Sequence, residues 1–230
     1  MKKILNIAAC VVALTLMVSG LAIAGDGGFY GSIKAGGSWL NGDSSFDRNT
    51  TEAITEDDFT TDGTGFVGGA IGYNWMDMDL PIRTELEYAY NGDFKYEYAD
   101  GNATVDNDIT IQTLMVNVYW DFYNDTAFTP YINGGVGAAF IEEDYDGEGV
   151  SAGDTLSDDS STTTNFAFNV GAGVGWSLTD SVILDLAYRY EYFGNGDEVT
   201  LTGSTGIGNY TFETENLATH KAILGLRYQF

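Results

Sequence analysis

The last residues of the chain alternate between apolar side chains and polar or small ones. A period of two is that of a β-strand, whose successive side chains point to opposite faces. An apolar face opposite a charged one predicts a strand of a membrane β-barrel, with the apolar face toward lipid and the polar face inward. The apolar positions are Phe230, Tyr228, Leu226, Leu224 and Ala222, and Gln229, Arg227 and Gly225 stand between them.

Seven earlier segments carry the same alternation, so the chain predicts eight strands. The third is very regular, because Ile82, Leu86 and Tyr88 alternate with Arg83 and Glu85. No stretch after the first 24 residues is apolar enough for a membrane helix, and a spanning structure must then be a closed barrel. The segments span residues 28–40, 65–76, 82–90, 109–122, 131–141, 165–178 and 182–193, followed by the end of the chain.

The connections between the segments alternate between short and long. This predicts an all-β fold, an eight-stranded antiparallel transmembrane β-barrel with an up-and-down meander, short periplasmic turns and four long extracellular loops. Both termini are then periplasmic. The short turns lie at 77–81, 123–130 and 179–181, and the long loops lie at 41–64, 91–108, 142–164 and 194–216.

Aromatic residues near the strand ends predict two girdles at the membrane interfaces, where amphipathic rings are favoured. A soluble β-sandwich or lipocalin-like barrel also alternates, but it would not need aromatic bands, one-sided long loops and an export leader together. The lower girdle would contain Trp75, Trp120, Phe122, Trp176 and Phe230, and the upper one Trp39, Tyr90, Phe140, Phe166 and Tyr192.

The first 24 residues have the pattern of a signal peptide. Lys2 and Lys3 precede a mostly apolar run, and Ala22-Ile23-Ala24 has the small-x-small pattern of a cleavage site. A retained membrane helix is the alternative. We predict cleavage of residues 1–24 and a mature domain at 25–230. Cys10 lies within the leader, which excludes a lipoprotein anchor and leaves the mature chain without disulfides.

The formal net charge of −25 argues against a nucleic-acid partner, whose phosphates would repel the protein. Most acids lie in the predicted long loops, which we expect to be mobile and hydrated. The spacing of Asp144, Asp146 and Glu148 is similar to that of a calcium loop, but Thr155 stands where such a loop needs its bidentate acid. We therefore predict no metal site and no cofactor, and the bridging of these acids to anionic lipid by divalent cations stays open. The acidic loop cluster comprises Asp57, Asp58, Asp144, Asp146 and Glu148.

The inner face carries small residues on some strands and long charged ones on others. Because an eight-stranded barrel is only wide enough for side chains to fill it, we favour a packed salt-bridge network. An ion-selective pore lined by the same charges is the alternative. The predicted lumen charges are Lys34, Arg83, Glu85, Glu87, Asp185, Arg189, Glu191, Lys221 and Arg227.

Three stretches together resemble the outer-membrane β-barrel family of opacity-like surface proteins, OmpA-type membrane domains and small porin-like proteins. They are the run from Asp79 to Tyr88, the runs from Leu114 to Phe122 and from Thr129 to Gly137, and the closing Gly225-Leu226-Arg227-Tyr228-Gln229-Phe230. The resemblance implies the fold and the outer membrane of a Gram-negative bacterium. It does not imply one activity, because the family includes adhesins, anchors, stress-related proteins and small channels.

We therefore predict a non-enzymatic surface protein with a structural role, whose acidic loops contact a host or surface ligand. A small porin-like channel is the alternative, and a lipid-modifying enzyme is third. The enzyme is disfavoured because His220 stands between Thr219 and Lys221, with no nearby Ser. We expect lipopolysaccharide and phospholipid as partners, and the barrel-assembly machinery at the C-terminal strand, with Tyr228 and Phe230 as its signature.

Overall fold

The computed structural model describes residues 27–48, 55–60, 63–99, 103–149, 159–203 and 209–230. The predicted signal peptide lies outside the described residues. Among the residues that are described, no helix is long and apolar enough to span a membrane. The elements are β1 (Gly28–Arg48), β2 (Thr55–Thr60), β3 (Thr64–Asn74), the 3₁₀ helix η2 (Trp75–Met78), β4 (Ile82–Ala99), β5 (Ala103–Asp121), β6 (Phe128–Gly149), β7 (Asp159–Ser177), β8 (Val182–Gly194), β9 (Val199–Thr202) and β10 (Asn209–Gln229).

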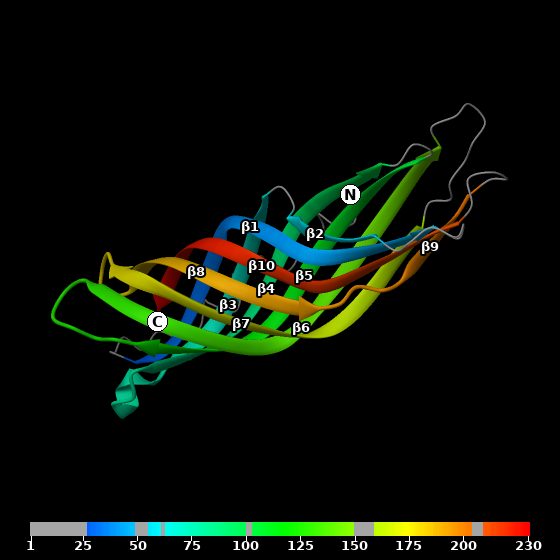
Figure 1. The fold of residues 1–230 in the computed structure, drawn as a ribbon. Helices are drawn as coiled ribbons and strands as arrows, with labels where there is room; N and C mark the ends of the chain where they lie inside the picture. Colours follow the sequence, from blue (N-terminus) through cyan, green and yellow to red (C-terminus); the bar gives the residue numbers. More distant parts are fainter. Residues whose placement is uncertain (1–26, 49–54, 61–62, 100–102, 150–158, 204–208) are drawn as a thin grey trace.

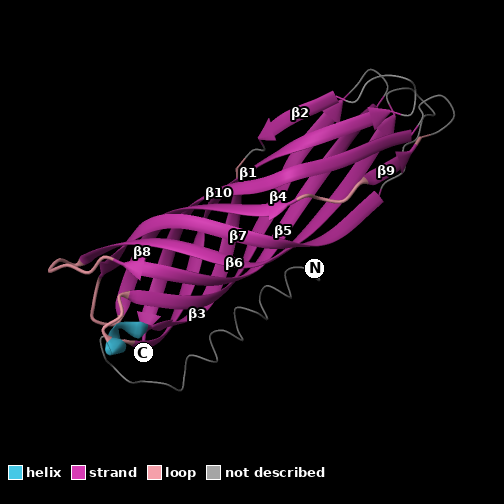
Figure 2. Cartoon of the chain, turned by 60° about the horizontal axis from the view of Figure 1, so that its bottom comes forward, coloured by secondary structure: helices cyan, strands magenta, loops and turns pink. Residues whose placement is uncertain are grey.

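Eight long antiparallel strands form a closed barrel, which confirms the predicted fold. Neighbours in sequence pair with one another, and β1 closes the sheet by pairing with β10 from Tyr30 opposite Gln229 to Arg48 opposite Tyr210. The short strands β2 and β9 add to β1 and β10 toward one end (Figure 2). Helix η2 and the C-terminus lie at the other end, which we call the lower end.

The outer wall of the barrel is apolar, as the alternation predicts. Because these side chains are exposed in the absence of lipid, they form the surface that the hydrocarbon of a bilayer would cover. Residues of both predicted girdles are among them. Examples from each part of the wall are Phe29, Ile33, Trp39, Val67, Leu86, Val116, Trp120, Val136, Phe140, Val170, Trp176, Leu186, Leu224 and Tyr228.

The second predicted strand is shorter at its lower end than the sequence suggests. It ends at Asn74, whose side chain accepts a hydrogen bond from the N–H of Met76 and caps η2. Asp79 ends η2 with a φ of 58°. Trp75 therefore belongs to η2, although its indole N–H still reaches the Thr84 hydroxyl of β4 at 3.0 Å.

The four predicted long loops are mostly strand, which corrects the sequence analysis. Strand β1 continues to Arg48, β4 to Ala99 and β6 to Gly149, well beyond the apolar outer band. Register irregularities mark the boundary, between Asn41 and Asp43, between Asn91 and Phe94, and between Leu217 and Ala218. Such bulges bend a strand and increase its twist. We call the part of the molecule beyond these bulges the extension.

In the extension, the barrel divides into two four-stranded sheets. Strand β4 pairs with β3 only as far as Asn91, and β7 pairs with β8 only as far as Phe168. One sheet then contains β2, β1, β10 and β9, and the other contains β4, β5, β6 and β7. Figure 1 shows these strands continuing toward the end where β9 lies. Open edges are possible here because water, unlike lipid, can satisfy backbone groups.

The two sheets of the extension enclose an apolar core, which the sequence analysis did not identify. Its side chains point inward, on the face that carries charges lower in the barrel. A core of this kind is the usual interior of a two-sheet sandwich in water. We call this cluster the apolar cap, and its fully buried members include Leu40, Phe94, Ile109, Ile111, Ile141, Phe193 and Leu217.

Two outward positions on β7 test where the lipid-facing band ends. Val170→Arg is expected to lower the free energy of unfolding in vesicles by about 2–4 kcal/mol, because it puts a charge at mid-band. Thr162→Arg, also exposed but in the extension, is expected to change it by less than about 0.5 kcal/mol. Denaturant titration monitored by heat-modifiable gel mobility measures both. Equal losses would contradict the assigned boundary.

Candidate functional site

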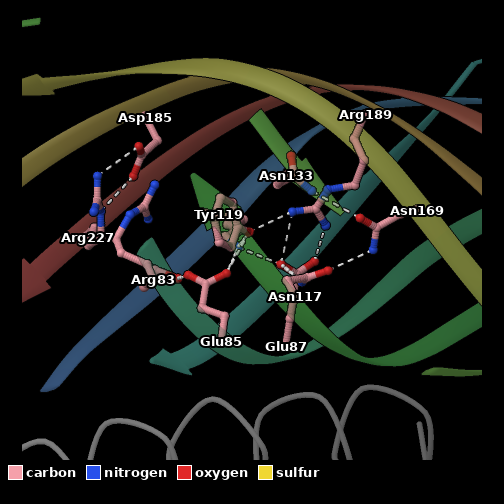
Figure 3. Close-up of polar contacts among 12 residues, drawn as sticks. Arg83, Glu85, Glu87, Asn117, Tyr119, Asn133, Asn169, Asp185, Arg189 and Arg227 are labelled. Atoms are coloured by element: carbon pink, nitrogen blue, oxygen red, sulfur yellow. Dashed lines mark hydrogen bonds and ion pairs between the residues drawn. The ribbon is translucent and has the colours of Figure 1, made fainter. Parts of the chain in front are cut away.

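The lumen is the first candidate site, and the structure places all nine sequence-predicted charges on its wall. Every described ion pair among them has side chains that are at most 11% exposed. They come from β1, β4, β8 and β10, whose inward positions meet at the centre of the barrel (Figure 3). A narrow lumen therefore brings together residues that are far apart in sequence.

Three acids and three bases form one continuous chain of alternating charge. The ammonium of Lys34 contacts both Glu85 and Glu87 of β4. Glu87 also accepts from Arg189 at 2.6 Å, and Arg189 lies 3.3 Å from Glu191. The chain continues from Glu191 to Lys221 of β10. Because each inner charge has an opposite neighbour, the network reduces the large cost of removing these groups from water.

Two further pairs lie nearer the lower end. Arg83 donates to both oxygens of Asp121 at 2.7 and 2.9 Å, and Arg227 lies 3.2 Å from Asp185. Asp121 was missed by the sequence analysis, although its parity along β5 is that of Asn117 and Tyr119. With Asp121 included, the inner network contains five acids and five bases.

Uncharged polar groups extend the central chain of ion pairs. The Tyr119 hydroxyl donates to Glu85 at 2.7 Å and accepts from Arg189 at 2.9 Å. A row of amides runs from Asn133 to Asn169 to Asn117, and Asn117 donates to Glu87. The sequence analysis assigned Asn117 and Tyr119 no role.

Glycines on the inner wall make room for these groups. A methyl group at Gly72 would overlap the ring of Tyr30, and one at Gly135 would overlap the amide of Asn117. These small inner residues thus lie directly beside large ones on the neighbouring paired strand, Gly72 beside Tyr30 and Gly135 beside Asn117. The result is a filled interior, because the apolar cap lies above the ion pairs and is also buried.

The outer surface of the extension is the second candidate site, and it is acidic. Asp106, Glu213 and Glu215 are exposed on it. Across strands β5 and β6, Asp106 faces Asp146 and Asp108 faces Asp144. Like charges directly opposite one another destabilise a sheet. The surface therefore carries a cost that the fold itself does not require.

A cation is also exposed on this surface. Lys95 pairs with Asp108 at 3.0 Å, and its side chain is 74% exposed. Lys34, Arg83, Arg189, Lys221 and Arg227 instead form ion pairs inside the lumen. Charge in the described part of the chain is thus divided by location, with paired charges inside and an excess of acids outside.

The predicted acidic loop cluster belongs to strands rather than loops. Asp57 and Asp58 lie in β2, and Asp144, Asp146 and Glu148 lie in β6. Alternate residues of an extended strand are about 6.8 Å apart. The calcium-like spacing in β6 is therefore not folded into a compact loop. Among the described residues, no group of three acids, histidines or cysteines is placed to hold a metal ion.

The remaining sequence-predicted residues lie on the outer wall. The Nδ1 atom of His220 is hydrogen bonded to the Tyr188 hydroxyl, and the imidazole ring packs beside the ring of Tyr190. Tyr228 is half exposed to the lipid side, and its ring centre is 5.3 Å from that of Phe230.

Comparisons with known proteins agree with this architecture. The family model described as "Outer membrane protein beta-barrel domain" matches residues 8–230. Outer membrane protein PagN of Salmonella typhimurium is 32% identical, over 97% of this chain and 98% of the relative. A protein of Rickettsia conorii that is named as a candidate adhesin is 29% identical, over 72% of this chain and 68% of the relative.

Solved structures show the same fold at low sequence identity. OprG of Pseudomonas aeruginosa superposes with a TM-score of 0.57 at 15% identity, over 91% of this chain and all of that one. The outer membrane protease OmpT of Escherichia coli gives 0.51 at 10% identity, over 92% and 99%. Because proteins of this fold carry different functions, these likenesses concern architecture alone.

The inner ion pairs can be tested at matched positions on β4 and β5. Asp121→Asn leaves Arg83 buried without its counter-charge, and both side chains are only 2% exposed. We expect it to lower the free energy of unfolding by about 3–5 kcal/mol. Asp108→Asn removes the partner of exposed Lys95 and is expected to leave the unfolding midpoint nearly unchanged.

Equilibrium unfolding in vesicles, followed by tryptophan fluorescence, measures both variants. The double variant Arg83→Met with Asp121→Leu should recover most of the loss, since no unpaired charge then remains. If Asp121→Asn were as mild as Asp108→Asn, the lumen would be solvated rather than packed.

Proposed function

Because the chain belongs to the outer membrane protein β-barrel family, we propose that it is a non-enzymatic surface protein that attaches to a host or surface ligand. The protein resides in the outer membrane of a Gram-negative bacterium. Its barrel anchors the extension, and the extension makes the contact. A relative named as a candidate adhesin supports the attachment role, and PagN, which is similar over nearly the whole chain, supports the location in the outer membrane.

The observation that carries the proposal is the division of charge. The acids of the lumen network are matched by cations, whereas Asp106, Asp146, Glu213 and Glu215 face outward, and Asp106 and Asp146 lie directly opposite each other. A surface of one sign attracts partners of the opposite sign and repels others. The ligand that fits is therefore cationic, such as a basic segment of a protein, rather than a sulfated or phosphorylated polymer.

Two further partners follow from the anchoring role. Lipopolysaccharide and phospholipid would cover the apolar outer band between the girdles. The last strand, with Tyr228 and Phe230 near its end, is the element that the barrel-assembly machinery would recognise. An enzymatic role has little support, because His220 is hydrogen bonded to a tyrosine on the outer wall and not to a nucleophile.

A small channel is the alternative that the inner charges suggest. Buried ion pairs and the apolar cap argue against it, because a water path would expose them. We expect the refolded mature protein to be silent in a planar bilayer, and Glu85→Gln and Arg227→Gln to leave it silent. Steady single-channel conductance that either substitution alters would favour the channel instead.

The attachment proposal can be tested by neutralising acids at one end of the molecule only. A variant with Asp106→Asn, Asp146→Asn, Glu213→Gln and Glu215→Gln removes four exposed acids of the extension. We expect it to reduce binding of expressing bacteria to host cells or to a basic peptide surface at least several-fold. Binding by the wild type should also fall as salt is raised.

The matched control removes four exposed acids from the lower end, with Asp77→Asn, Asp79→Asn, Asp125→Asn and Asp180→Asn. This control variant has the same net charge as the extension variant, but we expect it to bind like the wild type. Surface display of all variants is checked with antibody on intact cells. If both variants bound equally well, the acidic extension would not be the contact surface.

A further inference from the structure

One acid of the extension points inward instead of outward. Glu143 of β6 is fully buried, and within the described residues it takes part in no ion pair. The Tyr145 hydroxyl lies 3.5 Å from its Oε1, and its Oε2 has no hydrogen-bond partner. Every acid of the lumen network has a cation beside it, so Glu143 is a different kind of buried acid.

Glu143 lies against the connection of residues 194–198, which joins β8 to β9 across the open edge of β7. A methyl group at Gly196 would overlap Oε2 of Glu143. The Gly196 N–H donates to the Thr214 carbonyl of β10 at 2.8 Å. Asn195 accepts from the side chain of Asn165 on β7. The connection thus touches both sheets of the extension, and Glu143 is its contact with β6.

We propose that Glu143 is a proton-operated latch, which holds residues 194–198 against β6 when it is protonated and releases them when it is ionised. The neighbouring side chains Phe193, Val199 and Leu201 are buried. Release of the connection would uncover this apolar surface at the outer end of the protein. A change in external pH would therefore alter the surface that the extension presents.

The environment of the carboxyl supports this behaviour. Burial raises the pKa of Glu143 to about 7, and the negative charge of Asp197 also raises it. Thr214, the backbone N–H of Asp197 and Tyr145 are polar neighbours that lower the pKa, each by less than burial raises it. Because a solvated carboxyl titrates near 4.5, the closed form holds the proton over a pH range in which the open form does not.

The direction of the effect follows from these values. Below about pH 4.5 both forms are protonated and pH has no effect on the latch. Between that pH and about 7, the closed form loses stability as pH rises, by roughly tenfold in the equilibrium for each pH unit. Above about 7 both forms are ionised, and the equilibrium levels off.

The titratable groups around Glu143 determine which substitutions can test the latch. Its titratable neighbours in the described structure are Tyr145 on β6 and Asp197 in the connection. Opposite it in register are Ile109 of β5 and Ser161 of β7, which carry no charge. Thr214 is its neighbour from β10. Burial raises the pKa of Tyr145 far above neutrality, so Asp197 is the only one of these whose charge acts near neutral pH.

Hydrogen exchange measures the opening directly. The full mature protein in detergent micelles is exchanged from pH 5 to 8.5, and rates are corrected for the intrinsic pH dependence. We expect the protection factor of the peptide covering 194–198 to fall roughly tenfold per pH unit up to about 7 and then to level off. A protection factor independent of pH would overturn the proposal.

Three variants separate the latch from a structural role. Glu143→Gln should make protection independent of pH, because a neutral side chain stays latched. Glu142→Gln alters the adjacent, half-exposed acid and should keep the wild-type profile. Asp197→Asn removes the charge that raises the pKa, so protection should level off at a lower pH. If Glu143→Gln failed to fold, a pH-independent protection factor in the wild type and in Glu142→Gln would still refute the latch.

Discussion

The pairing of β1 with β10 is the contact on which the rest of the structure depends. In hydrocarbon no water satisfies backbone N–H and C=O groups, so a sheet can cross a bilayer only if its two edges pair with each other. Here that pairing runs from Tyr30 opposite Gln229 through the whole outer band. Closure with eight long strands fixes a narrow lumen. The narrow lumen in turn brings the inner charges into contact, so that each charge buried there needs an opposite partner.

The same constraint explains why the molecule changes character beyond the upper girdle. Where the outer wall meets water, the sheet no longer has to be closed, and it divides into two sheets at the edges of β4 and β7. Its interior no longer has to be the polar side, and the apolar cap replaces the ion pairs. Strand β6 shows the change within three residues. Phe140 is an apolar side chain on the outer face, Ile141 is an apolar side chain on the inner face, and Glu142 follows on the outer face.

This inversion of polarity also explains which features the sequence could predict. The alternation identified the eight spanning strands and the direction of their side chains, because lipid imposes one polarity on every strand. The sequence analysis ended the predicted strands too early. Beyond the band the alternation continues with its polarity reversed, with Ile141 inside and Glu142 outside, and this reversal resembles the end of a strand. Asp121 was missed because it adjoins Phe122 at a strand end that was interpreted as girdle. Contacts such as Glu87 with Arg189 depend on the closed geometry, which spacing along the chain does not encode.

Stability accounts for the inner charges but not for the outer ones. Glu87, Arg189 and Glu191 are arranged so that opposite charges are neighbours, as the low dielectric of the lumen requires. Asp106 and Asp146 are arranged in the opposite way, with like charges facing across two paired strands. A fold selected for stability alone would place a cation at one of these positions, as Lys95 does beside Asp108. The stability of the barrel therefore explains the ion pairs in the lumen but not the acids on the extension, and this difference is why the attachment proposal assigns the ligand contact to the extension.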